Sequence, residues 1–167
     1  MQVRTIIKVA AAGAALFVAA TPASAAVTTT NLSVTANVVA SCTVSATAMA
    51  FGTYTSLAAA HDDVTSTMNV ACTPGTTWAA TASAGGGTGA TLAVRKLMSG
   101  TNPLNYNLYT DSARTIIWGD GVAPNGSFTG TGTGATQAST VYGRIPGSQG
   151  TAAVGSYTDT VVISVTF

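Results

Sequence analysis

The chain has 167 residues and a formal net charge of +1 at pH 7, and only 7% of its residues are charged, against roughly 25% in an average soluble domain. It contains no glutamate and is dominated by glycine, alanine, threonine and serine, a composition that favours β-structure over solvated helices. The length suits one domain, and the scarcity of basic residues excludes nucleic-acid binding through a cationic surface.

The first 25 residues have the three-part layout of a secretory signal peptide. Two basic residues, Arg4 and Lys8, precede an apolar run at 9–20, and the small residues Ala-Ser-Ala follow at 23–25. The apolar run is shorter than the roughly 20 residues that span a bilayer. We therefore expect a cleaved signal at 1–25 rather than a transmembrane helix. The exported remainder would carry four basic and five acidic residues, since Arg4 and Lys8 are removed.

Alternating apolar and polar residues, which indicate strands with one buried face, recur along the chain after residue 30. Segment 56–63 is predicted as a loop or a short helical turn, and the Thr/Gly tract at 129–137 as a flexible connection. About seven or eight short strands with turns between them indicate an all-β sandwich. The candidate strand segments, in chain order, are 31–40, 41–54, 64–72, 76–84, 91–98, 104–111, a short one at 116–118, 139–145 and 157–167.

The two cysteines, Cys42 and Cys72, are expected to form a disulfide. An even number of cysteines in an exported chain is most simply explained in this way. A metal site needs more ligands at close spacing, and the chain holds a single histidine. Closing a loop of about 30 residues would stabilise the fold by roughly 3.6 kcal/mol on the chain-entropy estimate. We expect neither a metal nor another cofactor.

Residues with catalytic potential are few. His61 stands beside Asp62 and Asp63, but no Gly-x-Ser-x-Gly turn marks a nucleophile, so we interpret these residues as a polar loop. The glycine-rich stretches 85–90 and 130–135 lack the following helix of a phosphate-binding loop, and we interpret them as turns. The prediction is that no residue is catalytic and that the protein is not an enzyme.

The last segment of the chain alternates clearly. Val161, Ile163, Val165 and Phe167 occupy every second position, so they should share the face of a strand that is directed at the core. Domains usually end on polar residues that fray. A large aromatic residue in phase with a buried face is therefore an unusual last residue.

Short motifs follow one another in a specific order and spacing from about residue 41 to residue 167. They are Cys-x-Val at 42–44 with Phe-Gly at 51–52, the second cysteine at 72, Leu-Tyr-x-Asp at 108–111, Trp-Gly-Asp-Gly at 118–121, Tyr-Gly-Arg at 142–144 and Gly-x-Tyr-x-Asp-Thr at 155–160. Together they resemble the spore coat protein U domain family. That family includes the major pilin subunits of archaic chaperone–usher pili.

The resemblance implies an incomplete immunoglobulin-like β-sandwich that lacks its last strand, which leaves an apolar groove and an unpaired sheet edge. A periplasmic chaperone would lend a strand, and at the outer-membrane usher the N-terminal extension of the next identical or related subunit would replace it. The sandwich would comprise 41–167 and the donor-strand extension 26–40. Secretion would proceed through the periplasm to a cell-surface fibre that supports adhesion or biofilm formation. The chaperone would contact Val161, Ile163, Val165 and Phe167.

The expected donor strand is the alternating segment before the first cysteine. Leu32, Val34, Ala36 and Val38 would enter four successive positions of a neighbour's groove. Burying them would supply on the order of 5–10 kcal/mol before ordering costs. The same alternation also suits a first strand of the chain's own domain at 31–40, and the sequence does not separate these two interpretations.

Other functions share parts of this pattern. One is a secreted coat protein that does not polymerise by strand exchange. Another is a small lectin-like adhesin that presents Trp78 or Trp118 on an exposed face, and a third is a small secreted hydrolase that uses His61. Among pilus subunits, the one-domain length favours a shaft subunit over a two-domain tip adhesin.

Overall fold

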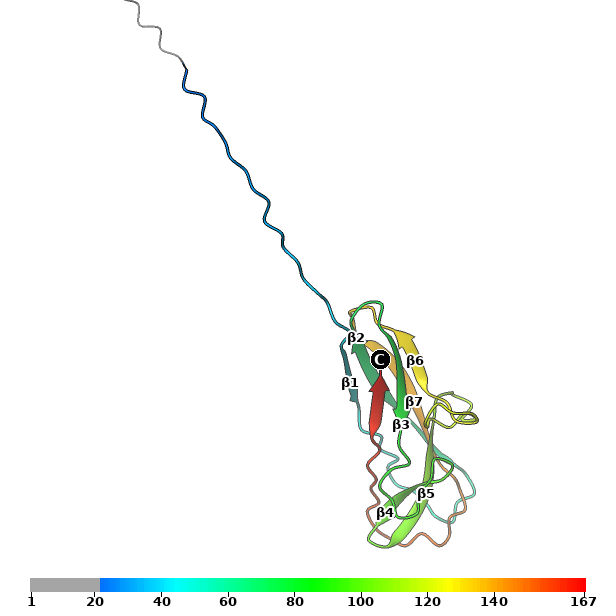
Figure 1. The fold of residues 1–167 in the computed structure, drawn as a ribbon. Coiled ribbons are helices and arrows are strands. Elements are labelled where there is room, and N and C mark those ends of the chain that lie inside the picture. Colours follow the sequence, from blue (N-terminus) through cyan, green and yellow to red (C-terminus); the bar gives the residue numbers. More distant parts are fainter. Residues whose placement is uncertain (1–21) are drawn as a thin grey trace, which may run out of the picture. The chain divides into compact units, whose positions relative to one another are not determined.

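The computed structural model describes residues 22–167, so most of the expected signal peptide (residues 1–21) lies outside the described residues. The chain divides into two units, residues 1–36 and residues 37–167. In the first unit, the described residues 22–36 form neither helix nor strand, and their side chains are exposed. The described strands all belong to the second unit (Figure 1). Across the described part, no helix is long and apolar enough to cross a membrane.

The second unit consists of two antiparallel sheets, which confirms the all-β prediction. The larger sheet has the strand order β1-β2-β7-β5-β4, and the smaller sheet has the order β6-β3-β8. Both sheets contain strands from distant parts of the sequence, as expected of a sandwich. The strands are β1 Cys42–Ala46, β2 Asp62–Cys72, β3 Thr77–Ala82, β4 Arg95–Ser99, β5 Asn102–Tyr109, β6 Phe128–Thr131, β7 Gln137–Ile145 and β8 Ile163–Thr166.

Alternate residues of the central strands form one hydrophobic core. Both tryptophans belong to it, since Trp78 is 5% and Trp118 is 1% exposed. The Trp118 indole N–H donates to the Ala80 carbonyl at 2.9 Å, and its ring meets Phe128 edge to face at 5.2 Å. The lectin alternative placed a tryptophan on an exposed face, and this placement is wrong. Other buried members are Met68, Val70, Cys72, Ala80, Ala82, Leu104, Tyr106, Leu108, Val141 and Ile145.

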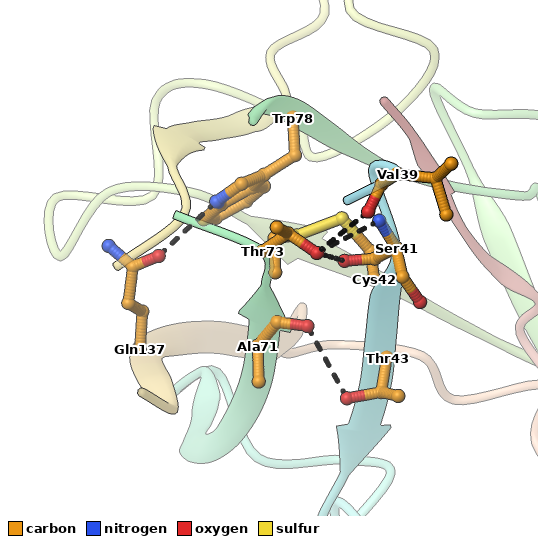
Figure 2. Close-up of a disulfide and its surroundings, with 9 residues drawn as sticks. Val39, Ser41, Cys42, Thr43, Ala71, Thr73, Trp78 and Gln137 are labelled. Atoms are coloured by element: carbon orange, nitrogen blue, oxygen red, sulfur yellow. Dashed lines mark hydrogen bonds between the residues drawn. A yellow bond between two sulfur atoms is a disulfide. The ribbon is translucent and has the colours of Figure 1, made fainter. Parts of the chain in front are cut away.

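The predicted disulfide is confirmed, and it joins β1 to β2 (Figure 2). Cys42 and Cys72 are directly opposite in the register of these strands, with their Cα atoms 4.1 Å apart. The neighbouring pair, Ser41 and Thr73, is hydrogen-bonded, because the Thr73 N–H donates to the Ser41 carbonyl at 2.9 Å. The cysteines thus occupy a non-hydrogen-bonded position, where side chains of opposite strands are closest. The link fixes the outer strand of the larger sheet.

Part of the Thr/Gly tract is a strand, although the sequence predicted a connection there. Residues Phe128–Thr131 form β6 and pair with β3. Gly130 lies opposite Trp78, and a Cβ at Gly130 would stand 2.6 Å from the indole ring. Glycine here therefore permits close approach to a buried ring rather than flexibility.

Several predicted strands are shorter than the sequence indicated, or absent. Of the candidate at 41–54, only Cys42–Ala46 forms a strand. The candidate at 116–118 makes isolated bridges to Tyr109 and Gly126 and forms no strand. The candidate at 91–98 begins only at Arg95, because Thr91 and Val94 bond to each other across a turn. The candidate at 157–167 is interrupted, since Thr158 makes a single bridge to Met98 of β4. Beyond it the chain changes sheet, and only Ile163–Thr166 pairs with β3 as β8. Segment 56–63 contains a turn and no helix.

Candidate functional site

Two strand edges lie near each other and are open. Within residues 22–167, β1 pairs only with β2, and β8 pairs only with β3. The two strands approach each other at the junction of the two sheets, and Figure 1 shows the red arrow of β8 close to β1. Such edges present unpaired backbone groups that readily accept another strand.

The register of β8 identifies which of its backbone groups face the open edge. Ser83, just after β3, donates its N–H to the Val162 carbonyl at 2.9 Å. In an antiparallel ladder, bonding toward one neighbour alternates along the strand, so the even-numbered residues of β8 bond to β3. The N–H and C=O groups of Ile163 and Val165 therefore point to the open edge.

The same reasoning applies to β1. Bonds from the Thr73 N–H to Ser41 and from the Thr47 N–H to Thr67 assign the odd-numbered residues to the ladder with β2. The backbone groups of Val44 and Ala46 consequently face outward. An inserted strand would find ladder partners on both sides.

Between and below these edges, an apolar cavity of about 310 Å³ opens toward solvent. One wall is the segment after β1, including Met49 and Phe51, and the other is the segment before β8, including Val161. Its floor is formed by core side chains from the larger sheet and by Trp118. The floor residues are Leu97, Tyr106, Leu108, Trp118 and Val141.

A second cavity, of about 690 Å³, shares Met49, Phe51 and Leu97 with the first. Its walls are 49–56 and 152–157, and Leu104 and Ile145 contribute to its floor. Because they share these lining residues, we call the two adjoining cavities together the groove. The groove follows two chain segments that are about a hundred residues apart in sequence and leads to the open edge of β8.

The C-terminal residues singled out from the sequence differ in burial. Val161, Ile163 and Val165 are half-buried and pack against the core, and the first two line the groove. Phe167 is 57% exposed, so the expectation that it continues the buried face is wrong. It lies beyond Thr166, the last residue paired with β3, and no strand of the described chain covers that edge.

The expected donor residues are exposed. Leu32 is 87%, Val34 84% and Val38 82% exposed, and Ala36 is also exposed. Segment 31–40 forms no strand, so the first strand of the domain is β1 instead. Just before β1, the Val39 carbonyl accepts a 3.4 Å bond from the Thr73 hydroxyl (Figure 2).

The His61 cluster is built differently from the polar loop that the sequence predicted. Asp62 and Asp63 begin β2, and the Asp63 carboxylate accepts two 2.7 Å bonds from Arg144 of β7. These bonds lower the pKa of Asp63 below its ordinary value of 3.8. Arg114 approaches the same carboxylate at 3.3 Å. The Nδ1 of His61 instead accepts a hydrogen bond from the Gly147 N–H at 3.1 Å. The Asp63 carboxylate therefore forms an ion pair with arginine and does not orient His61 as a catalytic carboxylate would.

No group of three or more metal-ligating side chains occurs in the part of the chain that the structure describes. The groove is lined mainly by apolar side chains, with one carboxylate, Asp159, on its wall. This arrangement suits an extended apolar segment better than a metal or a charged substrate.

Sequence reasoning assigned no role to several groove residues. Met49 has no local signal, because its burial depends on contact with distant strands. Phe51 and Asp159 stood in the Phe-Gly and Gly-x-Tyr-x-Asp-Thr motifs, and those motifs were the signal for them. Tyr106 lies in the strand predicted at 104–111, but nothing in that segment indicated a position in a groove.

Comparison with known proteins defines the family. Residues 28–164 match the model of the spore coat protein U domain. Over 173 aligned residues, the chain is 36% identical to Protein U of Myxococcus xanthus, with 95% of each protein covered. The chain belongs to the spore coat protein U domain family.

A solved structure shares the fold. The similar chain is part of the CsuC–CsuE chaperone–tip adhesion subunit pre-assembly complex from archaic chaperone–usher Csu pili of Acinetobacter baumannii. Its sequence is 23% identical, the TM-score is 0.58, and the match covers 78% of the present chain. The match covers 40% of the Csu chain, so the present protein corresponds to less than half of that chain.

Proposed function

We propose that this protein is a structural subunit of a cell-surface fibre of the chaperone–usher type and that it polymerises by donor-strand complementation. The observation that carries the proposal is the apolar groove beside the open edges of β1 and β8. A strand inserted there would bond to the outward backbone groups of Ile163 and Val165. Its alternate side chains would enter the groove, as in other cases of strand addition.

The donor in this proposal is segment 26–40 of another copy of the chain. This segment has no charged residue, which suits an apolar groove because burying an unpaired charge is costly. Leu32, Val34, Ala36 and Val38 would be the inserted side chains. They are exposed in the single chain, so insertion would remove apolar surface from water, worth on the order of 5–10 kcal/mol before ordering costs.

Other partners follow from the same geometry. An open edge beside an apolar groove invites aggregation, so a periplasmic chaperone would cover it until an outer-membrane usher exchanges the chaperone strand for the next subunit. Val161, Ile163, Val165 and Phe167 would contact the chaperone. The assembled fibre would lie outside the cell and support adhesion or biofilm formation.

The experiment that tests polymerisation uses unheated samples in detergent gels. The wild-type protein should give a ladder of multimers that collapses on boiling, because strand-exchanged joints dissociate slowly. Deleting residues 26–37 should abolish the ladder while the chain still forms a soluble chaperone complex. A wild-type protein that stays monomeric and soluble without a chaperone would overturn the proposal.

A second candidate is a coat protein that does not assemble by strand exchange. The match to the spore coat protein U domain and to Protein U favours it as the alternative. In that case deletion of residues 26–37 would leave any assembly unchanged. The same gel therefore separates the two functions.

A further inference from the structure

Asp159 stands where the C-terminal wall of the groove crosses from one sheet to the other. On one side, Thr158 exchanges two backbone hydrogen bonds with Met98 of β4, at 2.8 and 3.0 Å. On the other side, the Val162 carbonyl accepts the Ser83 N–H beyond β3 at 2.9 Å. The residues between these anchors have no ladder partner within the described chain, so other contacts must hold this part of the wall.

The Asp159 carboxylate supplies such contacts. One oxygen accepts the backbone N–H of Gly86 at 2.7 Å and that of Thr160 at 2.7 Å. The other oxygen accepts the hydroxyl of Tyr106 at 2.6 Å. One side chain therefore joins the wall to the loop between β3 and β4 and to β5. Hydrogen bonds to a charged acceptor are shorter and stronger than neutral ones.

Tyr106 extends this connection across the floor of the groove. It is 5% exposed, and its ring meets Phe51 edge to face, with the centroids 6.1 Å apart. Phe51 belongs to the opposite wall, and Phe51, Tyr106 and Asp159 all line the same cavity. A continuous set of contacts thus links the two walls through one tyrosine.

The glycine-rich stretch at 85–90 is shaped around the same carboxylate. Gly85 has a φ of +88°, and a Cβ at this position would overlap the Asp159 side chain. Gly86 supplies its N–H to that side chain. The stretch that the sequence predicted as a simple turn is therefore a cradle for Asp159.

The buried, positively charged Arg95 lies near Asp159 and favours a negative charge on that side chain. It is fully buried, and its guanidinium donates to neutral acceptors, the carbonyls of Ser83 and Trp118 and the Asn107 side chain. Within residues 22–167, Asp63 forms ion pairs with Arg114 and Arg144, and no carboxylate forms an ion pair with Arg95. Burial lowers the pKa of Arg95, and the nearby Asp159 carboxylate opposes that change.

We propose that Asp159 is a positioning residue for strand uptake, whose carboxylate holds the C-terminal wall at the spacing that an inserted strand of a second copy requires. The proposal rests on the proposed function but adds a separate claim. The groove exists because the sandwich lacks a strand, whereas tight retention of the inserted strand depends on the Asp159–Tyr106 contact.

The test is site-resolved hydrogen exchange on assembled multimers of the full-length chain. The amides of Ile163 and Val165 face the open edge, so an inserted strand alone protects them. In Asp159→Asn and Tyr106→Phe multimers, these two amides should exchange about tenfold faster than in wild type, as expected when a hydrogen bond to a charged group is lost. The amides that bond β2 to β7 should keep their wild-type rates.

The matched control is Asp63→Asn, which neutralises a hydrogen-bonded carboxylate outside the groove. It should leave exchange at Ile163 and Val165 unchanged. The double variant of Asp159 and Tyr106 should show no additional acceleration beyond the larger single effect, because both changes remove one contact. An Asp159→Asn chain that folds but no longer assembles would also support the proposal, just as faster exchange of the two amides would.

Two results have different meanings. Unprotected Ile163 and Val165 amides in wild-type multimers would contradict the proposed function itself. Protected amides in the wild type, with equal protection in both the Asp159→Asn and Tyr106→Phe variants, would overturn the positioning role alone. Uniform acceleration of all amides in the variants would also overturn it, because that pattern reports only lower global stability.

Discussion

At the level of single residues, the few charged side chains of the domain have specific partners. Asp63 binds Arg144 through two hydrogen bonds across β2 and β7. Arg114 donates to the Gly143 carbonyl at 3.2 Å and stacks over the Tyr142 ring at 5.7 Å. These contacts tie the loop after β5 to the outer side of the larger sheet.

The Asp63 ion pair predicts a pH dependence of stability. Because the Arg144 hydrogen bond lowers the pKa of Asp63 below 3.8, its contribution is fully present above the unfolded pKa and is lost as the pH falls through the folded pKa. We expect Asp63→Asn to lower the melting temperature at neutral pH by an amount equivalent to about 1 kcal/mol or less, since the pair is partly exposed. Below pH 3 the difference from the wild type should shrink. A difference that grows on acidification would contradict this role.

Gly130 predicts a steric effect. A Cβ there would stand 2.6 Å from the Trp78 ring, and the rigid indole is buried and cannot move away easily. Gly130→Ala should therefore destabilise the fold by about 1–3 kcal/mol, as overpacking of a core does. Gly75→Ala is a comparison in which nothing lies within 4 Å of the added Cβ, although its φ of +83° carries a backbone cost. Chemical unfolding of both variants measures the free energy of unfolding. A Gly130→Ala variant as stable as the wild type would show that the Trp78 ring leaves space for the added Cβ.

At the level of elements, the disulfide secures the strand that borders the groove. β1 has five residues and pairs on one side only within the described chain. Reducing the Cys42–Cys72 bond should lower the free energy of unfolding by roughly 3.6 kcal/mol on the chain-entropy estimate for a loop of about 30 residues. Urea unfolding with and without reductant measures this change, and Cys42→Ser with Cys72→Ser should reproduce it without reductant. Equal unfolding curves would contradict the role of the bond.

The two faces of the β8 backbone also predict different effects of proline. Val165→Pro removes an N–H that faces the open edge, where proline is tolerated within the fold. Ser164→Pro removes an N–H on the β3 side, so it should destabilise the sandwich. We expect the first variant to fold but to lose its multimers and the second to unfold at a lower temperature, as measured by melting curves and unheated gels. Multimers of Val165→Pro as stable as those of the wild type would show that the open edge is not the joint.

Local pattern predicted part of this arrangement and missed the rest for physical reasons. Alternation found β2, β3 and β7, because in each of these strands one face is more buried than the other. It missed β6, because the reason for glycine at position 130 is its contact with the Trp78 ring, which is distant in sequence. It made the last strand too long, because the chain changes sheet after Thr158. The groove was not visible at all from spacing, because its walls are about a hundred residues apart in sequence. Only the family resemblance predicted it.

At the level of the whole molecule, the domain is a sandwich in which the outer edges of β1 and β8 are unpaired within the described residues. Its core is complete around Trp78 and Trp118, while β1 and β8 have open edges above an apolar groove. The exposed apolar residues of 26–40 match that groove in character. We therefore expect the chain to be soluble only with a partner strand, either from a chaperone or from another copy.

Cross-linking tests this central claim most directly. A photoreactive residue replaces Val34, and multimers are assembled from an equal mixture of isotope-labelled and unlabelled chains. We predict cross-links from position 34 to groove residues such as Phe51 or Val161, between chains of different label. A photoreactive residue at Thr35, on the opposite face of the inserted strand, should not reach the groove floor. Cross-links confined to one chain, or no cross-links to the groove from position 34, would contradict the account.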